Sequence, residues 1–356
     1  MAVFTTINDP SAHFQAELYT GNGVDGTAQT FDAGVALQPD LMWIKRRNEA
    51  ASHNITDSTR GVTKYIYTDA VTIEGTDDNR VLSLDSDGFT LGTNEHTNEN
   101  NDTYSAYGWK ANGGTTSSNT NGSVTSTVQA NTTAGFSIAT WTGTGATATI
   151  GHGLGAVPQM IIIKCRSAAH DWQVLHHTIA TDYWTDYMVL NEGQAAADHA
   201  GKFNDTAPTS TVFTVGDNGS INPSSGTMVG YFFTPIQGFS KFGSWKGNGS
   251  ASSGPFIYTG FKPAWVMAKH SNDGTDDWLV WDDKTMPTNH TGDTVSVNGH
   301  AVNVSNSTHR LIDFYSNGFK IWYNDSNLNA NNKLYIYAAF AEAPFVTSEG
   351  IPATAR

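Results

Sequence analysis

The chain has 356 residues, of which only 15% are charged, and its formal net charge is −14. Its 19 Lys and Arg residues are scattered through an acidic chain, so nucleic acid is not an expected partner. The single cysteine excludes an intrachain disulfide framework, and no apolar run approaches the roughly 20 residues that span a bilayer.

The first segment carries a signal for a helical turn but none for export. In INDPSAHFQ, Asp9 precedes a proline, which predicts a short helical turn near residues 9–15. The first 14 residues hold neither a basic region nor an apolar stretch, so no signal peptide is expected. Further on, Pro39 opens the run PDLMWIK, in which apolar residues lead to Lys45.

The middle of the chain starts with a polar stretch at 111–135, rich in Gly, Ser, Thr and Asn. It is either a flexible linker or an extra hairpin, because SVTSTVQA alternates in the manner of a strand. The turn GHGLG then leads to PQMIIIK, from Pro158 to Lys164. Residues 182–202 are the main helix candidate.

The last third repeats the same pattern in FKPAWVMAKHS, where Pro263 precedes Lys269 by six residues. The separation of proline and lysine is six in all three copies, and a polar pair follows each at 18 or 19 residues from the proline. The pairs are Asp57–Ser58, His176–His177 and Asp282–Asp283. An internal threefold repeat is therefore expected.

The repeated element is best explained as a strand buried on both faces, with proline at its start where no ladder hydrogen bond is lost. The glycines of GHGLG are expected to form a turn with positive φ. Neither His152 nor Cys165 recurs in the other copies, so neither is expected to carry chemistry. A phosphate loop would need a helix after the glycines, and PQMIII cannot supply one.

Short strands with Thr/Asn/Gly turns predict an all-β protein of three tandem β-sandwich repeats, of jelly-roll or lectin-like type. The expected domains are residues 1–111, 112–236 and 237–346, followed by a loosely held tail at 347–356. Residues 111–135 would then be the linker or hairpin between the first two repeats.

Long stretches of the sequence resemble a repeat domain of marine tailed phages, especially cyanophages and pelagiphages. The stretches that carry the resemblance are residues 122–166, 238–269 and 313–345, and the similarity extends over nearly the whole chain. Such proteins are described as tail-fibre or virion structural proteins of unknown function. The resemblance implies a virion component with repeated lectin-like sandwiches, and it carries over no catalytic residues.

No metal site or catalytic centre is expected. His152, His170, His176 and His177 lie within one repeat, but their spacing fits no known ligand pattern. Glycan depolymerisation, the most plausible enzymatic alternative, would need two carboxylates across a cleft. Nothing in the sequence pairs the candidate carboxylates, which are Glu192, Asp276, Asp277, Asp282 and Asp283. We therefore predict no enzyme activity, no cofactor and no catalytic residues.

A binding site for a neutral glycan or a neighbouring virion protein is predicted in the loop at 271–293. The loop combines two tryptophans with four carboxylates, a combination suited to stacking on sugars and binding their hydroxyls. The predicted site residues are Trp278, Trp281, Asp276, Asp277, Asp282 and Asp283. The alternative interpretation is that the tryptophans pack between sheets.

The sequence thus predicts a non-enzymatic phage structural protein, located in the virion and made in the host cytoplasm without membrane insertion. A tail fibre or other host-adhesion component is favoured; the alternatives are a capsid-decorating or tail-structural protein without a host ligand, and a glycan depolymerase. The expected partners are other virion proteins, a host surface glycan and further copies of the chain in a homotrimer, since closed symmetric oligomers suit display on symmetric vertices.

Overall fold

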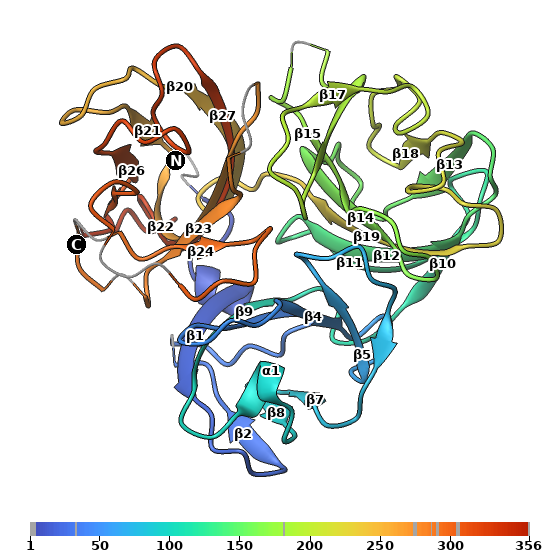
Figure 1. The fold of residues 1–356 in the computed structure, drawn as a ribbon, viewed down its shortest axis with the longest axis horizontal. Coiled ribbons are helices and arrows are strands. Elements are labelled where there is room, and N and C mark those ends of the chain that lie inside the picture. Colours follow the sequence, from blue (N-terminus) through green and yellow to red (C-terminus); the bar gives the residue numbers. More distant parts are fainter. Residues whose placement is uncertain are drawn as a thin grey trace.

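A computed structural model of the chain describes residues 5–32, 34–180, 182–272, 276–285, 287–289, 292–303 and 307–354. These residues form antiparallel β-sheets grouped in three lobes around a common centre (Figure 1). The helical elements in these ranges are the 3-10 turn η1 (Pro10–Ala12) and the single-turn α1 (Glu95–Asn98). None of the described helices is long and apolar enough to cross a membrane. The predicted all-β class is confirmed.

The first lobe contains a large sheet in the order β1-β9-β3-β4-β5-β6 and a small sheet in the order β2-β8-β7. The strands are β1 (Phe14–Thr20), β2 (Thr27–Gln29), β3 (Leu41–Arg46), β4 (Asn54–Asp57), β5 (Lys64–Tyr67), β6 (Gly75–Thr76), β7 (Val81–Asp85), β8 (Gly88–Leu91) and β9 (Thr103–Trp109). The predicted turn near residues 9–15 is η1, where the side chain of Asp9 accepts a hydrogen bond from the Ser11 N–H.

The second lobe has a large sheet in the order β10-β11-β12-β19-β14-β15-β16-β17 and a two-stranded sheet, β13-β18. The strands are β10 (Ser117–Asn119), β11 (Ser126–Asn131), β12 (Phe136–Thr142), β13 (Ala148–Gly151), β14 (Met160–Cys165), β15 (Gln173–His176), β16 (Asp186–Val189), β17 (Ala197–Asp198), β18 (Val212–Val215) and β19 (Thr227–Phe233). Of the two interpretations of residues 111–135, the structure has the hairpin, because β10 and β11 extend this sheet.

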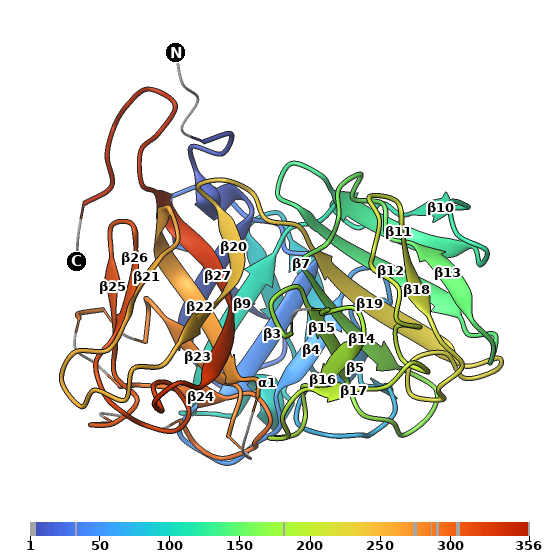
Figure 2. The same cartoon turned by 90° about the horizontal axis from the view of Figure 1, so that it is seen from above.

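The third lobe has a large sheet in the order β20-β27-β22-β23-β24 and a small sheet in the order β21-β26-β25. The strands are β20 (Ser240–Lys246), β21 (Phe256–Tyr258), β22 (Phe261–His270), β23 (Leu279–Asp282), β24 (Val295–Ser296), β25 (Ile312–Tyr315), β26 (Gly318–Ile321) and β27 (Leu334–Pro344). The segments that lead to both ends of the chain lie on the same side of the molecule (Figure 2), where Asn8 exchanges two hydrogen bonds with Ser348.

The three large sheets share the order of five strands, and their central strands share one register. In each, the central strand of the repeated element pairs with the last strand of the lobe, and the residue two positions after the repeated proline lies opposite the last aromatic residue. The opposed pairs are Leu41–Trp109, Met160–Phe233 and Trp265–Phe340. The three prolines therefore occupy corresponding positions. Only Pro263 lies inside a strand, where the register of β22 shifts.

The central strand of each large sheet is buried on both faces, as the apolar run predicted. Along β3, Leu41 and Trp43 point into a core shared by all three lobes, whereas Met42 and Ile44 pack toward the small sheet of their own lobe. The other lobes repeat this alternation with separate cores of their own. The small sheets consequently lie at the periphery, and the large sheets surround the centre (Figures 1 and 2).

The prediction of a helix at 182–202 is wrong. In its described residues the segment forms β16 and β17, which continue the large sheet beyond β15. Met188 contributes to the shared core, while its neighbour Tyr187 packs on the core of the second lobe, an alternation with the period of a strand. Pairing with β15 therefore outweighs the weak helical preference of this segment.

Candidate functional site

The two tryptophans of the predicted binding loop are buried. Trp278 and Trp281 are each 1% exposed, and they belong to different hydrophobic cores, the first to the shared core and the second to the core of the third lobe. Neither indole ring offers a face to a sugar. The alternative interpretation, packing between sheets, describes their environment.

The four carboxylates of the loop do not gather on one surface. Asp276 lies 2.6 Å from the ring Nδ1 of His270 and also accepts a hydrogen bond from Ser326. Asp277 accepts from Asn298 and lies 3.6 Å from Arg310. Residues 273–275, 286, 290 and 291 of the predicted loop lie outside the described residues.

The other two carboxylates lie at the end of β23, Asp282 as its last residue and Asp283 directly after it, and they face the first lobe. Asp282 is buried and accepts hydrogen bonds from the backbone and hydroxyl of Thr285. The backbone N–H of Asp283 donates to Ala264 O. The next residue, Lys284, forms an ion pair with Asp32 of the first lobe. The predicted site is thus divided between the interior of the third lobe and its junction with a neighbour.

Trp278 instead belongs to a set of three corresponding residues that connect the lobes. His53, Trp172 and Trp278 all lie four residues before the last residue of β4, β15 or β23. Each points a ring nitrogen at a backbone carbonyl of the neighbouring lobe. The contacts are His53–Ser296 (2.9 Å), Trp172–Tyr67 (2.7 Å) and Trp278–Val189 (2.9 Å). The contacts run from lobe one to three, from two to one and from three to two.

The repeated polar pairs supply a second cycle of contacts that joins the same pairs of lobes. Tyr107 of the first lobe donates to Asp282, at 2.9 Å, and Tyr231 of the second lobe donates to Asp57, at 2.7 Å. The third lobe has Ala338 at the corresponding position, and there the backbone carbonyl of Tyr337 accepts from His176 at 3.0 Å. The polar residues that recur in the sequence therefore join one lobe to the next.

Histidine tautomers in these cycles follow from the partners of each ring. The indole N–H of Trp43 donates to His53 Nδ1 at 2.8 Å, so the hydrogen of a neutral His53 lies on Nε2 and is donated to Ser296. Burial lowers the pKa of both His53 and His176 to about 3. Both imidazoles are accordingly neutral hydrogen-bonding groups at neutral pH.

The lysine of each repeated element is buried and donates to backbone carbonyls. Lys164 reaches Val71 of the first lobe at 3.1 Å, and Lys269 reaches Gly193 of the second lobe at 2.8 Å. Lys45 donates to Ala51 within its own lobe. Burial lowers the pKa of each of these three ammonium groups to about 8. Their common role is to pair carbonyls of connecting segments.

A buried ionic network adds to the junction of the first two lobes. Arg60 donates to Asp57 and lies 3.0 Å from Glu74, which also receives two hydrogen bonds from Arg166 of the second lobe. Burial alone would lower the pKa of Arg60, but Asp57, Tyr231 and Glu74 raise it above its ordinary value. Arg60 therefore stays charged, and the network joins the first lobe to the second through ion pairs.

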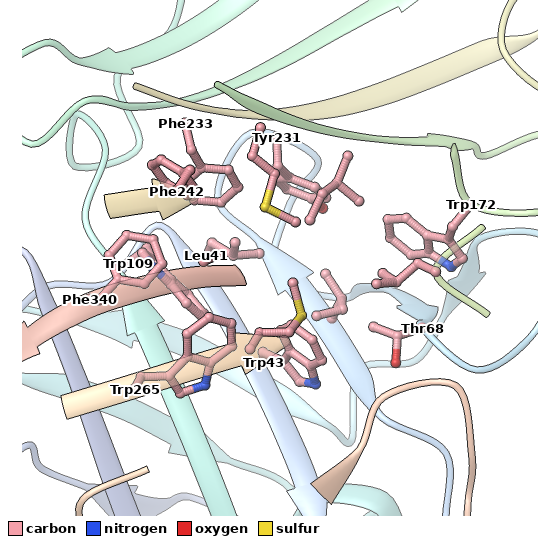
Figure 3. Close-up of a pocket in the computed structure, with 16 residues that line it drawn as sticks. Leu41, Trp43, Thr68, Trp109, Trp172, Tyr231, Phe233, Phe242, Trp265 and Phe340 are labelled. Atoms are coloured by element: carbon pink, nitrogen blue, oxygen red, sulfur yellow. The ribbon is translucent and has the colours of Figure 1, made fainter. Parts of the chain in front are cut away.

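The three lobes enclose a cavity of about 40 Å³ between their large sheets (Figure 3). Its lining comes from all three lobes and is apolar except for the Thr68 side chain: Leu41, Trp43, Ile55, Thr68, Trp109, Met160, Ile162, Trp172, Leu190, Tyr231, Phe233, Phe242, Trp265, Met267, Ala338 and Phe340. Ligand pockets usually measure about 300–1,000 Å³, so this space is much smaller than a typical ligand pocket.

The remaining residues that the sequence offered as candidates are packed or hydrogen-bonded within the fold. His152 is buried, stacks on Phe232 and interacts with the Thr209 carbonyl, and Cys165 is a buried free thiol. Gly153 and Gly155 have φ of 77° and 71°, which confirms the predicted turn. His177 points its Nε2 at Phe242 O. In the part of the chain that the structure describes, no three His, Cys, Asp or Glu residues are grouped to hold a metal ion.

Comparison with known proteins yields one family. Residues 9–344 match a family that is described as a domain of unknown function, DUF7483. No curated protein matches the chain. The match extends over the strands of all three lobes.

Proposed function

Because the chain belongs to the DUF7483 family of unknown function, its role has to be argued from its own residues, and we propose that it is a non-enzymatic structural protein of a marine tailed-phage virion. Within the virion it serves as a tail fibre or another host-adhesion component. It is built from three tandem β-sandwich repeats, residues 1–111, 112–236 and 237–346. The phage assignment rests on the sequence resemblance described above.

The observation that carries the structural role is the use of the polar and aromatic side chains. The residues that could have formed a site in each repeat instead form two cyclic sets of contacts between the lobes. Side chains in such contacts point at a neighbouring lobe and hold it in place. A rigid, three-lobed body of this kind suits a building block whose surface loops and small sheets carry any recognition.

A depolymerase would need two carboxylates across an open cleft, about 5–9.5 Å apart. Asp282 is buried between two lobes, and Asp276 is engaged by His270 and Ser326. These positions favour the structural role over the enzymatic alternative.

The oligomeric state that accompanies this proposal is the homotrimer expected from the sequence, three chains on a symmetric attachment point of the virion. Mass measurement of the purified protein at micromolar concentration checks it. A monomer at that concentration would contradict the homotrimer.

Immunogold labelling of intact virions tests the proposed function. We expect label at the tail or its fibres, and we expect purified protein to compete with phage for adsorption to host cells. Label confined to the capsid, without competition, would instead support the capsid-decorating alternative. Absence of the protein from purified virions would overturn the proposal.

A further inference from the structure

The outer face of the third lobe's small sheet exposes aromatic rings. Phe256 is 46% exposed and Tyr258 is 54% exposed, and both lie on β21. They are the aromatic side chains with the largest exposed fractions in the described part of the chain. Ile257 between them points into the core of the lobe, so the two rings share the outward face.

Polar groups adjoin these rings on the neighbouring strands. Phe256 pairs with Lys320 on β26, and Lys320 pairs with Asp313 on β25. The edge of the Tyr315 ring contacts Phe256, with centroids 5.9 Å apart. The indole of Trp322 donates to Asp313 at 2.6 Å and lies beneath the Lys320 ammonium at 4.4 Å. We call this set the aromatic patch: Phe256, Tyr258, Asp313, Tyr315, Lys320 and Trp322.

The other two lobes serve as internal controls. The buried phenylalanine after the small-sheet turn aligns the three lobes, at Phe89, Phe213 and Phe319. In this alignment the pair Phe256–Lys320 corresponds to two pairs of small residues. These pairs are Ala28–Thr90 and Thr149–Thr214. The other lobes therefore form this small sheet without aromatic residues on its outer face, so folding does not explain the aromatic residues of the third lobe.

We propose that the aromatic patch binds a neutral oligosaccharide, an inference that rests on the proposed adhesion function and names its ligand class. The Cα atoms of Phe256 and Tyr258, two residues apart on one strand, are spaced about 7 Å, so successive sugars of one chain can stack on the two rings. Lys320 provides a donor for hydroxyl groups beside the rings, whereas Asp313 is only 6% exposed and holds the rings of Trp322 and Tyr315 by accepting their hydrogen bonds.

The charge of the patch selects the kind of partner. Two ammonium groups adjoin the rings, Lys320 and Lys241, the latter 5.3 Å from the centre of the Tyr258 ring. The buried Asp313 offsets one of them, so the patch carries little net charge on a molecule of net charge −14. An anionic membrane or anionic polysaccharide would be repelled by the acidic molecule without a compensating basic surface. An uncharged ligand with an apolar face and a polar edge complements the patch.

Titration of the purified protein with neutral linear hexasaccharides of glucose, mannose and galactose tests this inference. We expect millimolar or tighter binding of at least one of them. The double variant Phe256→Ala, Tyr258→Ala should weaken that binding at least tenfold at an unchanged melting temperature. The control variant Ile351→Ala, which trims a 62% exposed apolar side chain outside the patch, should bind as the unmodified protein does.

Several results would overturn the inference. They are failure to bind any of the three sugars at millimolar concentration, equal affinity in the double variant, or binding only to phosphatidylglycerol vesicles. Self-association abolished by the double variant would assign the patch to a second copy of the chain. The virion labelling is independent of these results, so a failed sugar titration leaves the proposed structural role standing.

Discussion

Many buried polar side chains near the centre of the molecule find their hydrogen-bond partner in another lobe, although the indole nitrogens of Trp109 and Trp265 in the shared core have none among the described residues. His53, Trp172 and Trp278 are examples, since each donates its ring N–H to a backbone carbonyl of another lobe. An unpaired buried donor or acceptor costs about 1–3 kcal/mol. These contacts therefore favour one relative placement of the lobes over all others.

Acidification should destabilise the protein through its buried histidines. The pKa of His176 is about 3 in the folded state and about 6.5 when unfolded, so the unfolded chain binds more protons between these values. The contribution of His176 is fully present above pH 6.5 and is lost as the pH falls toward 3. The unfolding free energy should decrease by about 1.4 kcal/mol per pH unit for this group in that range.

Urea unfolding between pH 7 and 4 measures the effect. His176→Gln should reduce the pH dependence by about one proton, whereas His309→Gln, a change at an exposed histidine, should leave it unchanged. Parallel curves for His176→Gln and the unmodified protein would contradict the prediction.

Removal of one hydroxyl from the second cycle should weaken the junction of two lobes. In Tyr231→Phe the carboxylate of Asp57 keeps Arg60 but loses its 2.7 Å hydrogen bond from the second lobe. We expect a loss of about 1–3 kcal/mol in unfolding free energy, from denaturant titration. Tyr258→Phe, at an exposed position, is the matched control and should change stability by less than about 0.5 kcal/mol.

At the level of strands, the two faces of a central strand pack into different hydrophobic cores. On β27, Ala338 lines the shared cavity, and Ala339 packs into the core of the third lobe. The period of two along the strand alone decides which side chain reaches which core. Adjacent alanines on this strand are consequently not equivalent.

The effect of a larger side chain on stability should therefore depend on which face of β27 carries the change. Ala338→Val adds volume beside about 40 Å³ of empty space and should stabilise the protein by up to about 1 kcal/mol. Ala339→Val, in a core without that cavity, should destabilise it by about 1–3 kcal/mol through overpacking. Thermal melts of the two variants test the difference. Equal destabilisation by both would show that the cavity cannot accept a methyl group.

Strand-forming elements were predictable wherever a pattern is local. The buried runs before Lys45, Lys164 and Lys269 and the glycine turn at 151–155 follow from the apolar and glycine residues themselves. The prediction of a helix at 182–202 failed because the alanines and acidic residues of this segment favour a helix only in isolation. In the folded chain the segment pairs with the edge of β15 and forms strands. Local composition does not record which sheet edge lies nearby.

The candidate site failed for a related reason. A tryptophan flanked by acidic residues has the same local sequence whether it faces solvent or a neighbouring lobe, and only the packing of the lobes buries Trp278. The repetition of the polar pairs at Asp57, His176 and Asp282 was visible in the sequence, but its meaning as a contact between lobes was not. The aromatic patch could have been suspected, since Phe256 and Tyr258 replace small residues found in the other copies.

The whole molecule depends on a core to which all three lobes contribute. Large aromatic residues from each lobe meet there, among them Trp109, Phe233, Trp265 and Phe340. A lobe taken alone would expose this face to water, at a cost of about 25 cal/mol for each Å² of apolar surface. The lobes are thus mutually dependent for stability.

Unfolding should accordingly be a single cooperative transition. Tryptophan fluorescence and far-ultraviolet circular dichroism should give coincident melting curves for the full chain. A fragment of residues 112–236 should lack a cooperative melt and should aggregate, because its part of the shared core is exposed to water. A separately folding fragment, or two resolved transitions in the full chain, would contradict this expectation.

Both cycles of contacts join each lobe to the one before it and the first lobe to the third, although His176 of the second lobe is the donor in the last contact of the second cycle. A closed ring of this kind has no intrinsic beginning, and the hydrogen bonds between Asn8 and Ser348 bring the two ends of the path together. The order of the lobes along the chain could be rotated without breaking a contact in either cycle. The arrangement is what would result if three separate copies of one ancestral unit had first assembled as a ring and their genes had fused afterwards.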